Sequence, residues 1–263
     1  MIRDFNISGE EYNKIKPYPH LYLDNAIIDE KFAIDLQNEI LLLEKEKFDR
    51  YNNPFEEKLT LRDKFNYSPL LNKLFIYLES DEFINKLSKF INCQLYKDET
   101  RNFNGVHIYK TGEKLDIHLD AGIHPINKKK KHLTLGIYLS SNWKEEYKCE
   151  LEIWDGREDK LIKCANKIAP IFNRLILFTC NDYSYHGNPE PVNSPEDAKR
   201  IFITISYLSN IIDDNFKNQK QKAFFIARPN DPKDDEKDKL RLIRCNPELY
   251  KDVYIYNNSL FKK

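Results

Sequence analysis

Hydrophobic positions in the first hundred residues recur mostly at helical spacing. From Asp29, which can cap a helix, apolar residues follow at intervals of three or four, and Pro69 opens a second stretch of this kind. Residues 20–23 form a short apolar run typical of a strand, whereas residues 51–66 are polar and aromatic with no clear period. We therefore expect residues 1–100 to form a mostly helical N-terminal support region.

The spacing changes after about residue 100. Residues 115–119 alternate between apolar and polar side chains, which is the period of a strand with one buried face. Other strand-like runs, separated by turn residues, lie at 106–109, 132–140, 150–154, 160–165, 174–180 and 200–207. Many short strands at such intervals predict an antiparallel sandwich or barrel. The chain is thus expected to be mainly β with a helical N-terminal region, and residues 101–210 to be its core.

Residues 211–263 are strongly charged and contain few apolar positions. Within them, 223–226 is a short apolar run and 231–238 reads as a solvated stretch of mixed charge. So little apolar surface does not support a separate core. We expect a charged C-terminal appendage that packs back on the core.

Composition narrows the classes of function. The 263 residues include 42 Lys+Arg and 42 Asp+Glu, so bulk charge gives no support for nucleic-acid binding. No apolar run approaches the length needed to span a bilayer, and the first residues have no signal-peptide pattern. The five cysteines include no CxxC pair, which argues against a zinc knuckle. A cytoplasmic enzyme or binding protein is expected, with no membrane partner and with its oligomeric state open.

Candidate chemistry begins in the alternating strand at 115–119. His118 and Asp120 are two residues apart, so their side chains project from the same face of that strand. His186 follows a later strand and could supply a third ligand. Two histidines and one carboxylate form a facial triad that leaves coordination positions open, a set that suits non-haem Fe(II).

A basic residue lies on the interior face of the last predicted core strand. In 200–207, Arg200 shares a face with Phe202 and Thr204, while isoleucines occupy the other face. A guanidinium that projects inward among apolar neighbours needs an anionic partner. A ligand carboxylate could supply it through two parallel hydrogen bonds.

From Val106 to Asn210 the chain resembles the catalytic core of the Fe(II)/2-oxoglutarate-dependent dioxygenases, in particular their prolyl-hydroxylase-like branch. The motifs that carry the resemblance, in chain order, are His118-Leu119-Asp120, Ile137-Tyr138-Leu139-Ser140 with Asn142-Trp143, Cys149 to Ile153, Pro170 to Phe178, His186 and Arg200 to Tyr207. It implies a double-stranded β-helix, or jelly roll, flanked by helices. One departure is the pair Lys148-Cys149, where the family has two glycines.

The resemblance also implies an activity and a set of site residues. The activity is hydroxylation of an unactivated C–H bond with Fe(II), 2-oxoglutarate and O2, releasing succinate and CO2. The substrate stays open between a peptidyl proline, an amino acid, a carbohydrate and another metabolite. The implied iron ligands are His118, Asp120 and His186, the implied 2-oxoglutarate contacts are Arg200 and Tyr138, and the further pocket residues are Tyr109, Thr204 and Leu151.

Two other classes of function remain as alternatives. One is a non-catalytic β-sandwich binding protein that kept the pocket. The other is a zinc hydrolase that uses the same ligands, with Glu150 or Glu152 as its general base. Residues 128–131, four consecutive lysines, are expected to form a solvated loop beside the site, and whether they contact substrate is left open.

Overall fold

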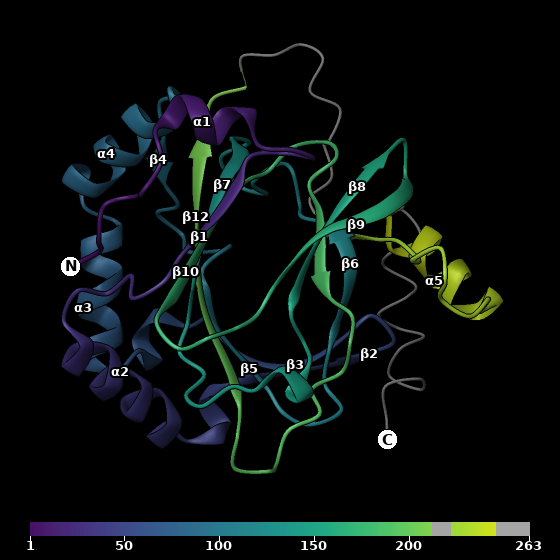
Figure 1. The fold of residues 1–263 in the computed structure, drawn as a ribbon, viewed down its shortest axis with the longest axis horizontal. Helices are drawn as coiled ribbons and strands as arrows, with labels where there is room; N and C mark the ends of the chain where they lie inside the picture. The colour runs from purple at the N-terminus through teal and green to yellow at the C-terminus, as the bar shows by residue number, and fades with distance from the viewer. Residues whose placement is uncertain (212–221, 246–263) are drawn as a thin grey trace.

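The computed structural model describes residues 1–211 and 222–245, and its helices lie mainly on one side (Figure 1). The helices are α1 (Gly9–Lys14), α2 (Glu30–Leu42), α3 (Pro69–Leu78), α4 (Asp81–Ile91) and α5 (Asp235–Cys245), with short 3₁₀ turns at Lys45–Lys47, Lys64–Asn66 and Glu145–Tyr147. Asp29 caps α2 by accepting a hydrogen bond from the Phe32 amide, as its position in the sequence predicts. No helix of the described residues is long and apolar enough to cross a membrane.

All strands of the described residues join one antiparallel sheet that folds over on itself. They are β1 (His20–Leu23), β2 (Asp49–Asn53), β3 (Glu56–Leu61), β4 (Tyr96–Lys97), β5 (Gly105–Tyr109), β6 (Leu115–Leu119), β7 (Lys130–Tyr138), β8 (Leu151–Arg157), β9 (Lys160–Ile168), β10 (Arg174–Thr179), β11 (Tyr185–Asn188), β12 (Arg200–Ser209) and β13 (Phe224–Phe225). The main path runs β1-β10-β7-β12-β5-β3-β6-β11-β8-β9.

The two ends of this path face each other as layers of a jelly roll. β10, β7, β12 and β5 form one layer, β6, β11, β8 and β9 form the other, and β3 connects them by pairing with both β5 and β6. Apolar side chains of the two layers meet in a shared cluster that includes Ile176, Phe178, Leu151 and Ile153. The mainly β, double-stranded β-helix fold predicted from the sequence is therefore confirmed.

Strand β12 shows how sequence alternation builds both faces of its layer. Ile201, Ile203 and Ile205 pack in the large core that also contains the buried faces of α2, α3 and α4. Arg200 and Phe202 project to the opposite side, into the space between the layers. The predicted division of this strand into a helix-facing side and an interior side is thus observed.

The flanking regions contain two elements that the sequence pattern did not predict. Residues 49–61 form the β2–β3 hairpin, so strands accompany the helices of the N-terminal region. Its period of two was hidden because Glu56 and Lys58, both buried, are charged residues on its inward face. Residues 231–238 are not only a solvated stretch, since α5 begins at Asp235. Residues 212–221 and 246–263 of the expected appendage lie outside the described residues.

Candidate active site

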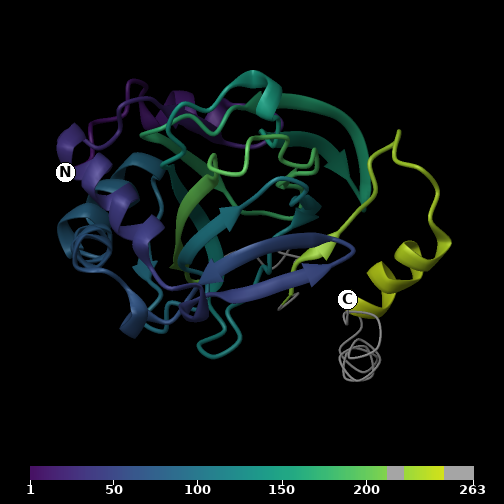
Figure 2. The same ribbon diagram turned by 90° about the horizontal axis from the view of Figure 1, so that it is seen from below.

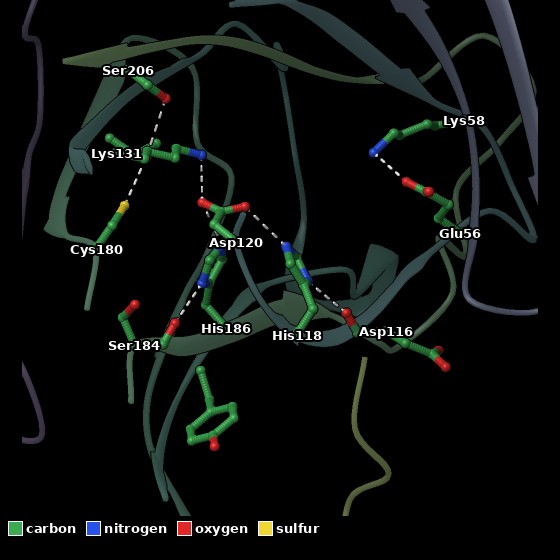
Figure 3. A network of polar contacts seen from close by, with 12 residues as sticks. Glu56, Lys58, Asp116, His118, Asp120, Lys131, Cys180, Ser184, His186 and Ser206 are labelled. Atoms are coloured by element: carbon green, nitrogen blue, oxygen red, sulfur yellow. Dashed lines mark hydrogen bonds and ion pairs between the residues drawn. The ribbon is translucent and has the colours of Figure 1, made fainter. Parts of the chain in front are cut away.

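The three candidate metal ligands converge at the β6–β11 pair. His118 and His186 are register partners, and Asp120 lies just past the end of β6. One ligand atom from each residue lies within 4.8 Å of the others, and the distance from His118 Nε2 to Asp120 Oδ1 is 3.5 Å (Figure 3). Gly187 allows the close approach of the strands, because a Cβ there would meet the Asp116 carbonyl oxygen at 2.7 Å.

Backbone carbonyls orient both imidazoles. His118 Nδ1 lies 2.9 Å from the Asp116 carbonyl oxygen, and His186 Nδ1 lies 2.8 Å from the Ser184 carbonyl oxygen. A carbonyl can only accept, so each Nδ1 carries the proton and donates it. Each Nε2 is then left with a lone pair directed at Asp120, which is the tautomer that a metal ligand needs.

Lys131 corrects the expectation of a solvated lysine loop. Lys130 and Lys131 belong to β7, and the Lys131 side chain is buried with its Nζ 2.6 Å from Asp120 Oδ2 (Figure 3). The ammonium thus lies on the side of the carboxylate away from His118. In the absence of a metal it supplies the positive charge that the buried carboxylate requires.

Charge and burial set the protonation of the triad. Burial alone would raise the pKa of Asp120, but the Lys131 ammonium holds that pKa well below its usual range. Burial, reinforced by His118, lowers the pKa of His186 to about 4. At neutral pH the site therefore presents a carboxylate and a neutral His186 imidazole, which are the forms that bind metal.

A cavity of about 440 Å³ extends from the triad between the two layers. His118, Asp120 and His186 all line it, and so does Arg200, which comes from β12 in the facing layer. Tyr109, Tyr138, Leu151 and Thr204, all buried, line it as well. Every site residue implied by the family resemblance therefore borders this one cavity.

Arg200 is buried with one nitrogen unused. Its Nε donates to the Cys149 carbonyl at 3.1 Å and its Nη2 to the Tyr138 hydroxyl at 3.3 Å. Its Nη1 has no hydrogen-bond partner among the described residues. The guanidinium also lies 4.8 Å from the ring centroid of Tyr109 and 5.0 Å from that of Tyr138. These contacts hold the cation in place but leave it without an anionic partner in the described part of the chain.

The pair Lys148-Cys149 keeps a backbone shape that glycine normally provides. Lys148 has φ 55° and ψ −147°, and Cys149 has φ 59°. Positive φ of this kind is strained for residues with a side chain. The Cys149 carbonyl is the group that accepts from Arg200 Nε, so the strained turn positions the guanidinium.

Sequence reasoning missed the charged part of the cavity wall. Glu56 and Lys58 line the cavity, and Lys58 Nζ lies 2.8 Å from Glu56 Oε2. The signal was the alternation of Glu56, Lys58 and Thr60 at every second position of β3. Glu152, named as a possible base of a zinc hydrolase, is instead buried against Lys167 and Trp154, and it does not line the cavity.

The donor set fits a divalent transition metal, and the cavity fits an oxo-acid beside it. Two imidazole nitrogens and one carboxylate suit Fe(II) and leave further positions open, although zinc also accepts such ligands. In the same cavity, the Nη1 of Arg200, which has no partner among the described residues, and the adjacent Tyr138 hydroxyl offer donors for a carboxylate. A cavity lined by both a metal-ligand set and a carboxylate receptor suits a chelating keto-acid that carries a second carboxylate.

A comparison with protein families decides the class. Residues 104–207 match the family model of the 2OG-Fe(II) oxygenase superfamily. This segment is therefore similar to the 2OG-Fe(II) oxygenase superfamily. The predicted enzyme class, an Fe(II)/2-oxoglutarate-dependent dioxygenase, is therefore confirmed, with Fe(II), 2-oxoglutarate and O2 as its cofactor and cosubstrates. No curated protein matches the chain by sequence.

Solved structures of other proteins share the fold of this chain at low identity. A prolyl hydroxylase from Trichoplax adhaerens, in complex with a hypoxia-inducible-factor peptide, has a TM-score of 0.57 and 18% identity over 78% of this chain and 88% of that one. A Pseudomonas putida prolyl-4-hydroxylase has a TM-score of 0.56 and 11% identity over 77% and 98%. HygX from Streptomyces hygroscopicus, bound to nickel, 2-oxoglutarate and hygromycin B, has a TM-score of 0.50 and 12% identity over 72% and 82%.

Proposed function

We propose that this oxygenase hydroxylates an aliphatic C–H bond, with His118, Asp120 and His186 as its iron ligands. The observation that carries the proposal is the shared cavity, which is lined both by the triad and by the buried Arg200, whose Nη1 is unpartnered among the described residues. A dicarboxylic keto-acid would satisfy the triad and the guanidinium at once. No such pairing is expected of a binding protein or of a zinc hydrolase.

In this proposal Arg200 and Tyr138 bind and orient 2-oxoglutarate. The guanidinium pairs with the distal carboxylate through Nη1, and the Tyr138 hydroxyl donates to the same group. Tyr109 and Thr204 border the carboxylate, while Leu151 forms part of the apolar wall that excludes water. These contacts would direct the keto-acid end toward the triad.

When bound, iron supplies the coupling of O2 reduction to oxidative decarboxylation of the keto-acid. One oxygen atom enters succinate as CO2 leaves, and the second enters the substrate, so R–H becomes R–OH. The protein side chains hold the reactants and exclude water. Lys131 fixes Asp120 by its hydrogen bond to Oδ2 and so holds the carboxylate beside both imidazoles, where it would join His118 and His186 as a metal ligand.

Two of the similar structures contain a bound molecule of a kind that supports the proposed substrate class. The Trichoplax enzyme was solved with a peptide, and HygX with the small molecule hygromycin B. Both kinds of substrate must reach the iron centre from outside. We therefore propose a peptidyl or small-molecule substrate that enters through the mouth of the cavity.

Succinate formation tests the proposal. Protein loaded with Fe(II) and 2-oxoglutarate without oxygen is exposed to air, and succinate is quantified for the wild type, His186→Ala and Arg200→Ala. We expect His186→Ala to lose succinate formation and Arg200→Ala to need far more 2-oxoglutarate. Lys199→Ala, which removes a half-buried cation next to Arg200, is the matched control and should behave as wild type. Wild-type protein that neither forms succinate nor binds 2-oxoglutarate would contradict the proposal.

A further inference from the structure

The outer part of the cavity is built from segments that the metal and 2-oxoglutarate do not need. Residues of the β2–β3 hairpin line one side of it, and residues of β13 and α5 line the other. In Figure 2 β13 lies beside this hairpin, with α5 beyond it. The two sides touch through stacked rings of Phe55 and Phe225, whose centroids are 4.8 Å apart. Phe225 in turn lies against the His118 ring, at 5.4 Å, so this mouth opens next to the triad.

Within this mouth a single carboxylate lies between two cations. Lys58 Nζ is 2.8 Å from Glu56 Oε2, and Arg244 Nη2 is 3.4 Å from Glu56 Oε1. The Glu56 and Lys58 side chains are 7% and 8% exposed. Burying such ions costs desolvation energy that their attraction often fails to offset, so stability alone does not explain them. The two cations and one carboxylate of this cluster leave a net charge of +1.

A further cation lies beside this cluster. Arg62 is exposed and makes no ion pair with any described residue. Its guanidinium lies 5.1 Å from the centroid of the Tyr51 ring, and Lys58 Nζ lies 5.3 Å from the same centroid. The Tyr51 ring thus holds the two cations toward one region of the mouth.

Positive charge also exceeds negative charge over the lining of the cavity as a whole. Apart from Lys222, the basic side chains of the described residues that line the cavity are Lys58, Arg62, Lys131, Arg200 and Arg244, and the acidic ones are Glu56 and Asp120. Fe(II) brings two positive charges and 2-oxoglutarate two negative charges, so loading the site leaves the excess unchanged. His107, also in the wall, responds to this field: burial and then Lys58 and Arg62 hold its pKa well below the usual value.

We infer that the prime substrate carries an anionic group, a carboxylate or a phosphate, that binds Lys58 and Arg62 at the mouth of the cavity. This inference rests on the proposed function. The anion would lie on the β3 side, near the Glu56–Lys58 pair that Figure 3 shows beside His118. A substrate held there would present its reacting carbon to the triad. A neutral prolyl side chain alone would leave the excess charge uncompensated.

Simple anions can probe this site directly. Protein is loaded with Mn(II) and 2-oxoglutarate under nitrogen, which prevents turnover, and 2-oxoglutarate binding is first checked by calorimetry. The probes are acetate and methyl phosphate, with acetamide and trimethyl phosphate as neutral counterparts. NMR relaxation of each probe reports its approach to the paramagnetic Mn(II). We expect at least one anion to show saturable relaxation enhancement and neither neutral counterpart to do so, and the anion that binds identifies the substrate group.

Variants separate the proposed site from binding at the metal itself. The double variant Lys58→Gln/Arg62→Gln should weaken anion binding about tenfold or more, because each lost contact is a charge-assisted hydrogen bond. Lys45→Gln/Lys64→Gln removes two exposed charges outside the cavity and should change nothing. Arg62→Gln alone, at an exposed position, should weaken binding severalfold even if the Lys58 change disturbs folding.

Three results would overturn the inference while leaving the proposed function intact. They are absence of anion binding in protein that binds 2-oxoglutarate, equal binding of the neutral counterparts, and equal anion binding by wild type and both Arg62 variants. If 2-oxoglutarate itself fails to bind, the proposed function fails and the inference fails with it.

Discussion

Replacing Arg200 by methionine should have opposite effects on stability and on cosubstrate binding. The side chain is 2% exposed, and its Nη1 has no partner among the described residues. Without 2-oxoglutarate the protein therefore buries a cation that lacks an anion. Methionine fills similar space without a charge, so the ligand-free protein should become more stable while the binding site for the carboxylate is lost.

The magnitudes follow from the contacts. An uncompensated buried charge costs about 3–5 kcal/mol, and the surrounding tyrosine rings offset roughly 1–2 kcal/mol of it. Removing Arg200 also leaves the Cys149 carbonyl without its donor, which costs about 1 kcal/mol. The midpoints of these ranges give a net gain of about 1.5 kcal/mol, or a Tm about 3–6 °C higher for a chain of this size. Losing a buried charge pair with 2-oxoglutarate costs about 2–5 kcal/mol, which raises its Kd by about 30-fold to a few thousand-fold.

Two assays on the same preparations test both effects. Thermal unfolding of metal-free, ligand-free protein gives the change in Tm, and calorimetry with Mn(II) under nitrogen gives the Kd of 2-oxoglutarate. Lys199→Met, at the adjacent half-buried position, is the control for loss of a charge and should leave that Kd unchanged. A lower Tm for Arg200→Met together with an unchanged Kd would refute the reasoning, because Arg200 would then be a structural cation.

Three other predictions concern protonation, the metal ligand and backbone strain. Burial lowers the pKa of His132 to about 4. The unfolded chain therefore binds a proton at this imidazole more readily than the folded protein does, so stability is full above pH 6.5 and is lost as the pH falls toward 4. In urea titrations His132→Gln should reduce this acid loss by about 1–3 kcal/mol, and an unchanged pH profile would contradict the assignment. Lys131→Met should destabilise metal-free protein by about 2–3 kcal/mol, because Asp120 loses its partner, and Mn(II) should restore more stability to the variant than to wild type. Equal losses with and without Mn(II) would show that Lys131 does not act through Asp120. Lys148→Gly should raise the free energy of unfolding by about 1 kcal/mol, since glycine adopts that backbone without strain; a decrease in denaturant titration would count against strain there.

The placement of the candidate metal ligands and of Arg200 around one cavity could be predicted because strand periodicity fixes which side chains share a face. His118 and Asp120 are two residues apart, and Arg200 alternates with isoleucines, so each faces the interior once the strands form. The long separation of His186 along the chain did not matter, because the resemblance named it as the partner and β11 places it opposite His118.

The rest of the cavity wall depends on contacts that no local pattern encodes. Lys131 is the last of four lysines, and only the pairing of β7 in the sheet turns it inward to Asp120. Glu56 and Lys58 are charged residues on a buried strand face, where periodicity analysis expects apolar ones. Their partner Arg244 is separated from them by most of the chain. The roles of such residues in the cavity wall can be recognised only from the three-dimensional structure, in which the fold brings them together.

The fate of molecular oxygen tests the central claim most directly. Protein with stoichiometric Fe(II) and 2-oxoglutarate is exposed to ¹⁸O₂, and the succinate formed is analysed by mass spectrometry, with His186→Ala as the blank. We expect the wild type to form succinate that carries one ¹⁸O atom and His186→Ala to form no succinate. Succinate without the label, or equal amounts of labelled succinate from the variant, would contradict the assignment of this triad as the oxygen-activating centre.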